Sequence, residues 1–182
     1  MEFRTTAIPG AYIISPEPLE DDRGFFARTW CDAEFAAMGE MPPRWVQCNI
    51  SFNRLRGTLR GMHLQAEPHG EEKLVRCTAG AIHDVIVDLR RDSPAYLHSV
   101  GVELSAQNRR MIYIPRGVAH GFLTLADATE VFYQMGNTYV AEAARGYRYD
   151  DPAFGIAWPG AVEVISPRDA GYADYAGGGP GS

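Results

Sequence analysis

Three side chains suited to acid–base or anion chemistry lie close together between residues 47 and 78. They are Arg60, His63 and Lys73, and they stand in a run of apolar residues that favours extended chain. Gly61 interrupts this run, which predicts a bulge or a close approach of the backbone to a ligand. We therefore expect Arg60, His63 and Lys73 to face one pocket.

Strand parity tests whether two candidate residues can point into the same interior. Lys73 shares one face of its strand with two apolar neighbours, Val75 and Cys77. Tyr133 shares a face of its own strand in the same way, with Val131 and Met135. Lys73 and Tyr133 can therefore both point into an apolar barrel, where a buried polar group needs a partner or a ligand.

Arg60 and His63 fail the same test if their strand is regular. They are an odd number of residues apart, so an unbroken strand places them on opposite faces. A bulge at Gly61 would bring both to the pocket. The alternative is an arginine at the surface and a histidine that is hydrogen-bonded in the core.

These residue types suit proton transfer at a carbon next to a ketone. Such C–H bonds are weak acids, so the reaction needs a base of near-neutral pKa, a group that stabilises the enolate oxygen, and a second proton carrier on the opposite face. His63 suits the base because an unperturbed imidazole titrates near physiological pH. Lys73 supplies the positive charge, and Tyr133 supplies a phenol as acid.

A metal site is the alternative chemistry for the histidines. His63 is followed two places on by Gln65, not by a second histidine, and His120 in a Pro-x-Gly-x-x-His element is the other plausible ligand. His69 lies in a loop with Pro and Gly, and only a large bend would add it to the set. Two neutral histidines with a Gln make a poor site for a first-row metal. We therefore predict no metal and no cofactor.

The elements that must position these residues are mostly short strands. Alternating apolar residues predict strands over 81–89, 100–104, 111–114 and 129–135, and shorter β-type runs occupy 11–15 and 25–30. Residues 31–38 predict one short helix, with Asp32 as a candidate N-cap. Many short strands and few helices favour an antiparallel sandwich or barrel.

Six blocks of sequence carry a family resemblance. They are DRGFF from Asp22, QCNIS from Gln47, RGMHLQ from Arg60 with EKLVR from Glu72, DVIVDLR from Asp84, IPRGVAHGF from Ile114 and DDPAFGIAWP from Asp150. In order and spacing they resemble the dTDP-4-dehydrorhamnose 3,5-epimerase family over about residues 5–170, a more specific signal than any single motif. The resemblance implies an all-β double-stranded β-helix, the cupin jelly roll, with a few short peripheral helices.

The resemblance also implies roles for individual residues. His63 matches the family's catalytic base, Tyr133 its proton donor and Lys73 its enolate-stabilising lysine. The stretch Ser166-Pro167-Arg168-Asp169 matches a Ser-x-Lys-Asp element of the family, so Asp169 is expected to orient His63, with Arg168 in place of the Lys. The alternative for Asp169 is an N-cap or turn residue.

The implied ligand is a nucleotide-diphosphate sugar, most simply a dTDP-sugar. Arg23 and Arg60 suit the diphosphate because a guanidinium can bind phosphate oxygens bidentately. The resemblance adds further substrate contacts at Gln47, Asn49, His120, Tyr139 and Phe26, although Phe26 could equally be a core residue. In the family the segment around Arg23 reaches a neighbouring subunit's pocket, which implies a homodimer.

Several positions depart from the family pattern. Arg28 and Ala144 stand where members usually carry Glu, and Leu64 stands where Tyr is commoner. The implied reaction is cofactor-independent epimerisation of dTDP-4-dehydro-6-deoxy-D-glucose at C3 and C5. The alternatives are a C3-only epimerase or a ketoisomerase on a related dTDP-, CDP- or GDP-sugar, and a sugar-binding cupin without catalysis.

Length and charge limit the class of protein. A chain of 182 residues with 17 basic and 23 acidic side chains predicts one domain of net charge −6, which argues against general affinity for nucleic acid.

The chain shows no leader and no run long enough to cross a bilayer, so a cytoplasmic location without a membrane partner is expected. A low-complexity tail at 176–182 is expected to be mobile. Cys31, Cys48 and Cys77 lack CxxC spacing and are expected to be mostly buried thiols.

Overall fold

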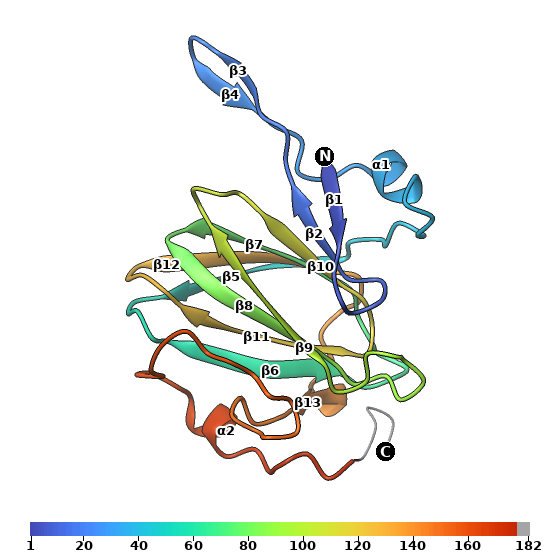
Figure 1. Ribbon diagram of the computed structural model, residues 1–182, viewed down its shortest axis with the longest axis vertical. Helices are drawn as coiled ribbons and strands as arrows, with labels where there is room; N and C mark the ends of the chain where they lie inside the picture. Colours follow the sequence, from blue (N-terminus) through green and yellow to red (C-terminus); the bar gives the residue numbers. More distant parts are fainter. Residues whose placement is uncertain (178–182) are drawn as a thin grey trace.

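The computed structural model describes residues 1–177, which form two antiparallel β-sheets packed face to face (Figure 1). The six-stranded sheet runs in the order β1 (Glu2–Thr5), β2 (Tyr12–Ser15), β10 (Met111–Ile114), β7 (Lys73–Ala79), β12 (Thr129–Met135) and β5 (Gln47–Asn53). The five-stranded sheet runs in the order β13 (Ala144–Gly146), β6 (Leu59–Gln65), β11 (Val118–Thr124), β8 (Ala81–Asp88) and β9 (Ser99–Ser105). A hairpin of β3 (Leu19–Asp21) and β4 (Gly24–Phe26) stands apart, and the helical segments are α1 (Asp32–Ala36), η1 (Ala141–Ala143) and α2 (Pro167–Ala170). The predicted cupin jelly roll is confirmed.

The main core lies between the two sheets and is built by alternate residues of facing strands. Val75 and Val131 of the six-stranded sheet are fully buried there, together with Ile82 and Ile86 of the other sheet. Successive side chains of a strand point to opposite faces. The alternation predicted over 100–104 is confirmed, since Val102 and Leu104 join this core and Val100 packs against it.

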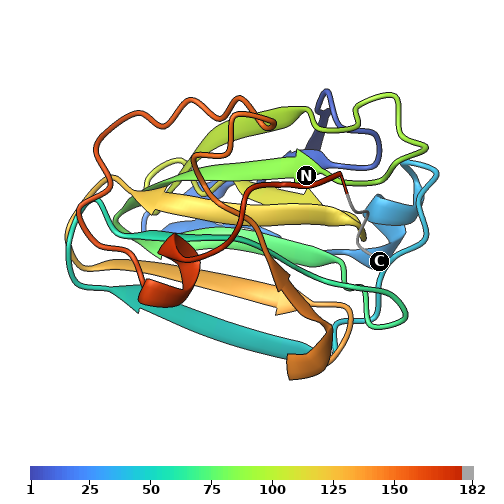
Figure 2. The ribbon, with the colours of Figure 1, turned by 90° about the horizontal axis from the view of Figure 1, so that it is seen from below.

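The outer face of the five-stranded sheet is also covered. Val85, Val87 and Leu89, which alternate along the predicted 81–89 strand, form a second buried cluster with Phe154 of the C-terminal chain. Figure 2 shows this C-terminal chain, which carries α2, crossing the outside of the sheet. β8 is therefore buried on both faces, and its apolar contacts hold the C-terminal chain against the sheet.

The outer face of the six-stranded sheet is covered over only part of its width. Phe35 of α1 is fully buried against Tyr113 of β10 and Trp30, with ring centroids 4.7 and 5.0 Å away. At the other edge of the sheet, Ile50 and Phe52 on the outer face of β5 are 62% and 54% exposed. This sheet therefore presents an apolar strip that residues 1–177 leave uncovered.

Some local predictions are wrong. The β-type run at 25–30 is a strand only up to Phe26. Phe26 is the register partner of Leu19, the first residue of β3, so the residues after Phe26 have no strand to pair with in the hairpin. The short helix begins one residue later than predicted, with Cys31 in the N-cap position, while the carboxylate of Asp32 accepts a hydrogen bond from Trp30 Nε1 at 2.6 Å.

The cysteines also differ from the prediction, since only Cys77 is buried. Cys48 is exposed because the even-numbered residues of β5, an edge strand, face outward. No helix within residues 1–177 is long and apolar enough to cross a membrane. Residues 178–182 of the predicted mobile tail lie outside the described residues.

Candidate active site

A cavity of about 880 Å³ opens between the two sheets. Strands β5, β7 and β12 form one wall, β6, β11 and β13 form the opposite wall, and the chain around α2 closes part of the rim. The lining residues include ten of the twelve side chains that the sequence predicts for the site, namely His63, Lys73, Tyr133, Asp169, Gln47, Asn49, Arg60, His120, Tyr139 and Arg168.

The imidazole of His63 is paired with the carboxylate of Asp169. His63 Nε2 lies 2.8 Å from Asp169 Oδ1, and the backbone N–H of Gly61 lies 3.4 Å from the other carboxylate oxygen. Burial by itself raises the pKa of Asp169, but the hydrogen bond and the charge of His63, with contacts to Gly61 and Ser166, together hold this pKa below its usual value. The carboxylate is therefore ionised at neutral pH and can orient the imidazole.

The local sequence explains why Asp169 reaches the cavity. Ser166 is the N-cap of α2, and its Oγ accepts a hydrogen bond from the backbone N–H of Asp169 at 3.0 Å. Pro167 follows in the first turn of this short helix, as is common at that position. The capping residue is thus Ser166, and the side chain of Asp169 remains available for His63.

A bulge in β6 brings Arg60 and His63 to the same cavity. Along the β6–β11 ladder, His63 is opposite His120 while Arg60 is opposite Phe122, so β6 contains one residue more than its partner between these two pairs. Gly61 has a φ of +129°, and a Cβ built on it would lie 2.4 Å from the Cα of Gly121. The predicted bulge is confirmed, and the backbone of Gly61 closely approaches a neighbouring strand.

Lys73 and Tyr133 reach the cavity from the opposite sheet. Tyr133 is the register partner of Val75, and Lys73 is the partner of Met135, so the predicted parity of both strands is confirmed. Burial raises the pKa of Tyr133, and the positive charge of Arg60 offsets this only in part. The phenol therefore keeps its proton at neutral pH and can act as an acid.

A carboxylate that the sequence reasoning missed lies beside Lys73. Lys73 Nζ donates to Glu71 Oε1, and both side chains are almost fully buried in the cavity wall. Glu71 precedes Lys73 by two residues, and if the strand parity of Lys73 is extended back to this position it also places Glu71 inside. That spacing was the available signal.

A second histidine–carboxylate pair faces the cavity from the five-stranded sheet. His120 Nε2 lies 2.7 Å from Asp84 Oδ2, and Asp84 is fully buried in β8. His120 is also the direct register partner of His63. The predicted contact residue is thus held by a long-range pair that no sequence spacing reveals.

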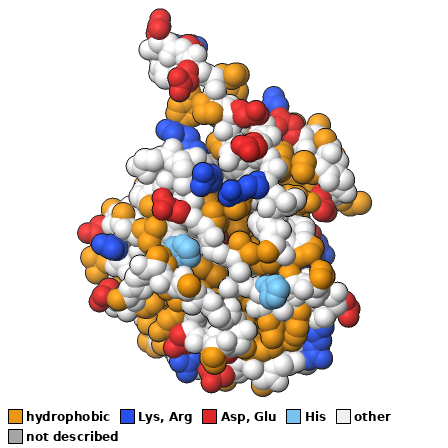
Figure 3. Space-filling view, viewed as in Figure 1, with side chains coloured by type: hydrophobic (Ala, Val, Ile, Leu, Met, Phe, Trp, Pro, Cys, Tyr) orange, Lys and Arg blue, Asp and Glu red, His pale blue; other side chains and the backbone are white. Residues whose placement is uncertain are grey.

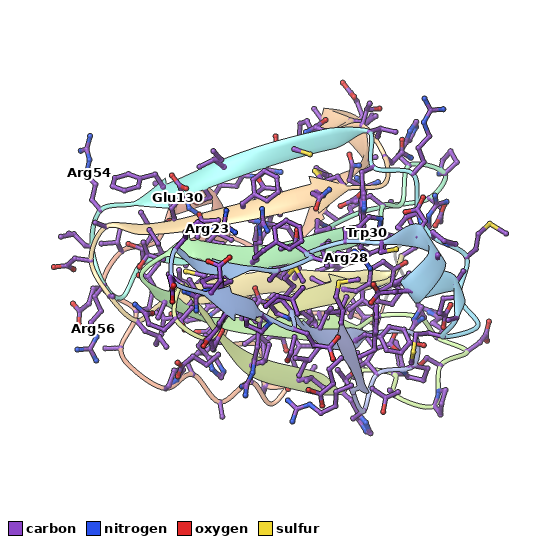
Figure 4. The ribbon with its side chains drawn as sticks, turned by 90° about the horizontal axis from the view of Figure 1, so that it is seen from above. Arg23, Arg28, Trp30, Arg54, Arg56 and Glu130 are labelled. Carbon is purple, nitrogen blue, oxygen red and sulfur yellow. The ribbon has the colours of Figure 1, made fainter. Side chains whose placement is uncertain are left out.

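The cavity carries more positive than negative side chains, although the chain as a whole has a net charge of −6. Four cationic residues line it, against two carboxylates: Arg60, Lys73, Arg145 and Arg168, and Glu71 and Asp169. Arg145 was not predicted. Arg54 and Arg56, on the loop after β5, point away from the cavity into solvent (Figure 4). The local excess of positive charge suits an anionic ligand.

Polar side chains of β5 extend the same wall. Gln47 Nε2 donates to Asn49 Oδ1 at 3.2 Å, and Gln47 Oε1 accepts from the backbone N–H of Tyr139 at 3.1 Å. Arg60 Nε donates to Asn53 Oδ1 at 2.8 Å. These contacts fix the backbone near Tyr139 and leave the terminal guanidinium nitrogens of Arg60 free for a ligand.

Arg23 and Phe26 lie outside the cavity of their own chain. Both belong to the β3–β4 hairpin, which stands off the body of the molecule (Figures 1 and 3). The side chain of Arg23 is 90% exposed and bonds to Asp21 of the same hairpin, and Phe26 is 72% exposed. Figure 4, which looks down on this end of the molecule, shows Arg23 and Arg28 on the N-terminal segment that carries the hairpin.

The histidines do not converge as metal ligands would. Within residues 1–177, no group of three or more His, Cys, Asp or Glu side chains is arranged to hold a metal ion. The Nε2 atoms of His63 and His120 each contact a different carboxylate, of Asp169 and Asp84 respectively. The arrangement instead provides two oriented imidazoles, an ammonium and a protonated phenol in one space.

Fold and site together define a class: a cupin jelly roll whose cavity holds acid–base groups for isomerisation. The particular family follows from comparison with known proteins. The family model for dTDP-4-dehydrorhamnose 3,5-epimerase matches residues 5–176, and the chain belongs to this family.

Individual relatives agree with this assignment. A dTDP-4-dehydrorhamnose 3,5-epimerase of Methanothermobacter thermautotrophicus is 47% identical over 177 residues, 94% of this chain and 94% of the relative. A dTDP-4-dehydrorhamnose 3-epimerase of Streptomyces niveus is 37% identical over 93% of this chain and 81% of the relative. The crystal structure of a 3,5-epimerase from Bacillus anthracis with TDP and PPi bound superposes with a TM-score of 0.91 at 36% identity, covering 96% of this chain and 99% of that one.

Proposed function

We propose that this protein is a cofactor-independent epimerase that converts dTDP-4-dehydro-6-deoxy-D-glucose to dTDP-4-dehydro-L-rhamnose. The observation that carries the proposal is the 2.8 Å contact between His63 Nε2 and Asp169 Oδ1, in a cavity that Lys73 and Tyr133 also line. The family of the chain supports the choice of nucleotide and sugar.

In the proposed reaction His63 is the general base. If the ring proton sits on Nε2 and is donated to Asp169, Nδ1 keeps the lone pair that removes a proton from C3 or C5 of the ketosugar. The side chain of His63 is 41% exposed, so a ligand in the cavity can reach it. Asp169 stabilises the imidazolium that forms, because its carboxylate is held ionised.

The electrons left by the proton move onto the C4 oxygen as an enolate, which the Lys73 ammonium stabilises. Tyr133 then gives a proton to the other face of the carbon and inverts the centre. Two features support this division of labour: His63 and Tyr133 come from opposite sheets, and the raised pKa of Tyr133 keeps its phenol protonated. Solvent returns the proton to Tyr133 and removes the one on His63, so no net proton is consumed.

The diphosphate is expected to bind the arginines of the cavity. Arg60 was predicted for this role, and Arg168 and Arg145 are further candidates because they line the same cavity. TDP is bound in the relative from Bacillus anthracis. Because Ala144 and Arg28 replace the usual carboxylates, we infer that the contacts to the base and sugar differ in detail from those of other members.

A C3-only epimerase is the second candidate. The observation that favours it is the 37% identity to the 3-epimerase of Streptomyces niveus, over most of the length of both chains. Both candidates use the same base and enolate. They differ in whether the sugar turns within the site, so that C5 also reaches His63.

Proton exchange in heavy water tests the proposal. The purified protein is incubated with dTDP-4-dehydro-6-deoxy-D-glucose in D₂O, and the sugar is followed by NMR. Deuterium at both C3 and C5 is the expected result. Deuterium at C3 alone would replace the proposal with the C3-only epimerase, and no exchange with dTDP-, CDP- or GDP-linked 4-ketosugars would end the epimerase proposal.

A sugar-binding cupin without catalysis is separated by the same assay and a His63→Ala variant. For an enzyme, the variant loses exchange and retains most of its affinity for dTDP. A binding module would show no exchange in the wild type, and the substitution would change affinity alone.

We also infer that two copies of the chain assemble into a homodimer. Two observations support this: the β3–β4 hairpin carries the exposed Phe26 and Arg23 away from their own body, and the outer face of β5 presents Ile50 and Phe52. Light scattering at micromolar concentration should give twice the 20.1 kDa chain mass. An Arg23→Ala variant should remain dimeric and bind dTDP more weakly, and a monomeric wild type that is fully active would contradict the inference.

A further inference from the structure

The carboxylate of Glu71 is the largest unexplained feature of the cavity wall. Its side chain is 2% exposed, and Oε1 accepts a hydrogen bond from Lys73 Nζ. The second oxygen, Oε2, is buried and has no hydrogen-bond partner within residues 1–177. A buried charge is costly unless it is paired, so the Lys73 ammonium is the counter-charge of this carboxylate.

The backbone explains why the two groups meet. Glu71 and Lys73 are two residues apart where the chain enters β7, and both side chains line the cavity. Glu72, between them, points to the other face, where its Oε1 accepts from Arg116 Nε at 2.8 Å. The chain thus offers two adjacent glutamates of identical chemistry, only one of which faces the cavity.

Lys73 is the only lysine in the chain. The other sixteen of its seventeen basic residues are arginines. Arginine carries a rigid planar fork, whereas lysine carries a compact charge on a flexible four-carbon stem. A flexible ammonium stabilises an enolate well only if something holds it in position, because an error of about 1 Å can cost about 100-fold in rate.

We propose that Glu71 is a positioning residue that fixes the Lys73 ammonium where the C4 oxygen of the enolate develops; this rests on the proposed epimerase function. Glu71 acts through Lys73, because its Oε1 accepts from Lys73 Nζ and its Oε2 is buried without a hydrogen-bond partner within residues 1–177. An ammonium has three donors. One N–H of Lys73 donates to Glu71, and the other two remain for the ligand.

Steady-state kinetics of three variants test the proposal. Glu71→Met removes the acceptor at nearly constant length and is expected to lower kcat by about 10- to 100-fold, with KM within about threefold of wild type. Glu71→Gln keeps an oxygen for Lys73 Nζ and is expected to restore most of that loss. Glu72→Met is the matched control and should behave as wild type. Wild-type kcat in Glu71→Met, or equal losses in Glu71→Met and Glu71→Gln, would overturn the proposal.

A second readout does not depend on turnover. Labelling with ¹⁵N-lysine gives a single Nζ resonance, because the chain contains one lysine. Relaxation of this resonance should report a restricted ammonium in wild type, Glu71→Gln and Glu72→Met, and a mobile one in Glu71→Met. Equal mobility in all four proteins would overturn the positioning role. If wild type shows no sugar exchange, the epimerase function fails, while the resonance still decides whether Glu71 holds Lys73.

Discussion

Two histidine–aspartate pairs lie next to each other in the cavity, and they differ in access. The His63–Asp169 and His120–Asp84 contacts are nearly equal in length, at 2.8 and 2.7 Å, and the two histidines are register partners. The side chain of His63 is 41% exposed, whereas that of His120 is 11% exposed and Asp84 is fully buried. Hydrogen-bond geometry alone therefore does not identify the base.

The two pairs also differ in how they are built. Asp84 and His120 belong to adjacent strands of one sheet, so the sheet itself fixes their contact. Asp169 belongs to α2, in the chain that crosses the outside of the molecule, and only the packing of that chain brings it to His63. The comparison indicates that the open pair is suited to move protons, and that the closed pair is suited to hold its strands and the ligand in place.

Replacing each histidine by Asn is the most direct way to break this comparison. Loss of a general base typically costs about 10²- to 10⁴-fold, so His63→Asn is expected to lower kcat by about 10³-fold while dTDP still binds. His120→Asn is expected to lower kcat by about tenfold and to raise KM. Exchange of the sugar C3 hydrogen in D₂O measures both. Losses of the same size in the two variants would mean that access does not separate the pairs.

Replacing each aspartate by Asn also compares the two pairs, and we expect smaller effects on kcat than from the histidine variants. The folded pKa of Asp169 is held below its unfolded value of about 3.9. Its contribution to stability is therefore present above about pH 4 and is lost as pH falls through the folded pKa. Asp169→Asn should lower the free energy of unfolding by about 1.5–3 kcal/mol at pH 7, the range for a hydrogen bond to a charged group.

Urea unfolding at pH 7 and at successively lower pH measures this contribution. The difference in the free energy of unfolding between wild type and Asp169→Asn should shrink as the carboxylate of the wild type becomes protonated.

In turnover assays Asp169→Asn should lose about 10- to 100-fold in kcat, because His63 loses its orienting partner. The matched variant Asp84→Asn should stay within about tenfold of wild type, and a larger rate loss there than at Asp169 would contradict the assigned roles.

Much of the fold could be predicted from the sequence because alternation is a local signal. The strands over 111–114 and 129–135 were predicted with the observed bounds, and the inward faces of Lys73 and Tyr133 followed from parity. The hairpin strand was predicted too long because its end is set by the length of its pairing partner. Cys48 was misplaced because the sequence does not show that β5 is an edge strand with an uncovered face.

Site residues could be predicted only where their spacing along the chain or the family resemblance indicated them. Asp169 was identified through its block, and the bulge that brings Arg60 to the side of His63 was signalled by Gly61. The contact of Asp84 with His120 joins separate strands, so no pattern along the chain indicates it. Glu71 had a usable signal, its parity with Lys73, but an acidic residue in a loop is more often solvent-exposed.

The close approach of the paired strands β6 and β11 at Gly61 and Gly121 limits which sequences can adopt this fold. A methyl group at Gly61 would overlap the Cα of Gly121, and one at Gly121 would lie 2.8 Å from the carbonyl oxygen of Arg60. Neither strand can acquire a side chain here without moving its neighbour, and each strand carries one of the two histidines. The backbone spacing of the two strands that carry the histidines thus depends on a pair of residues that have no side chains.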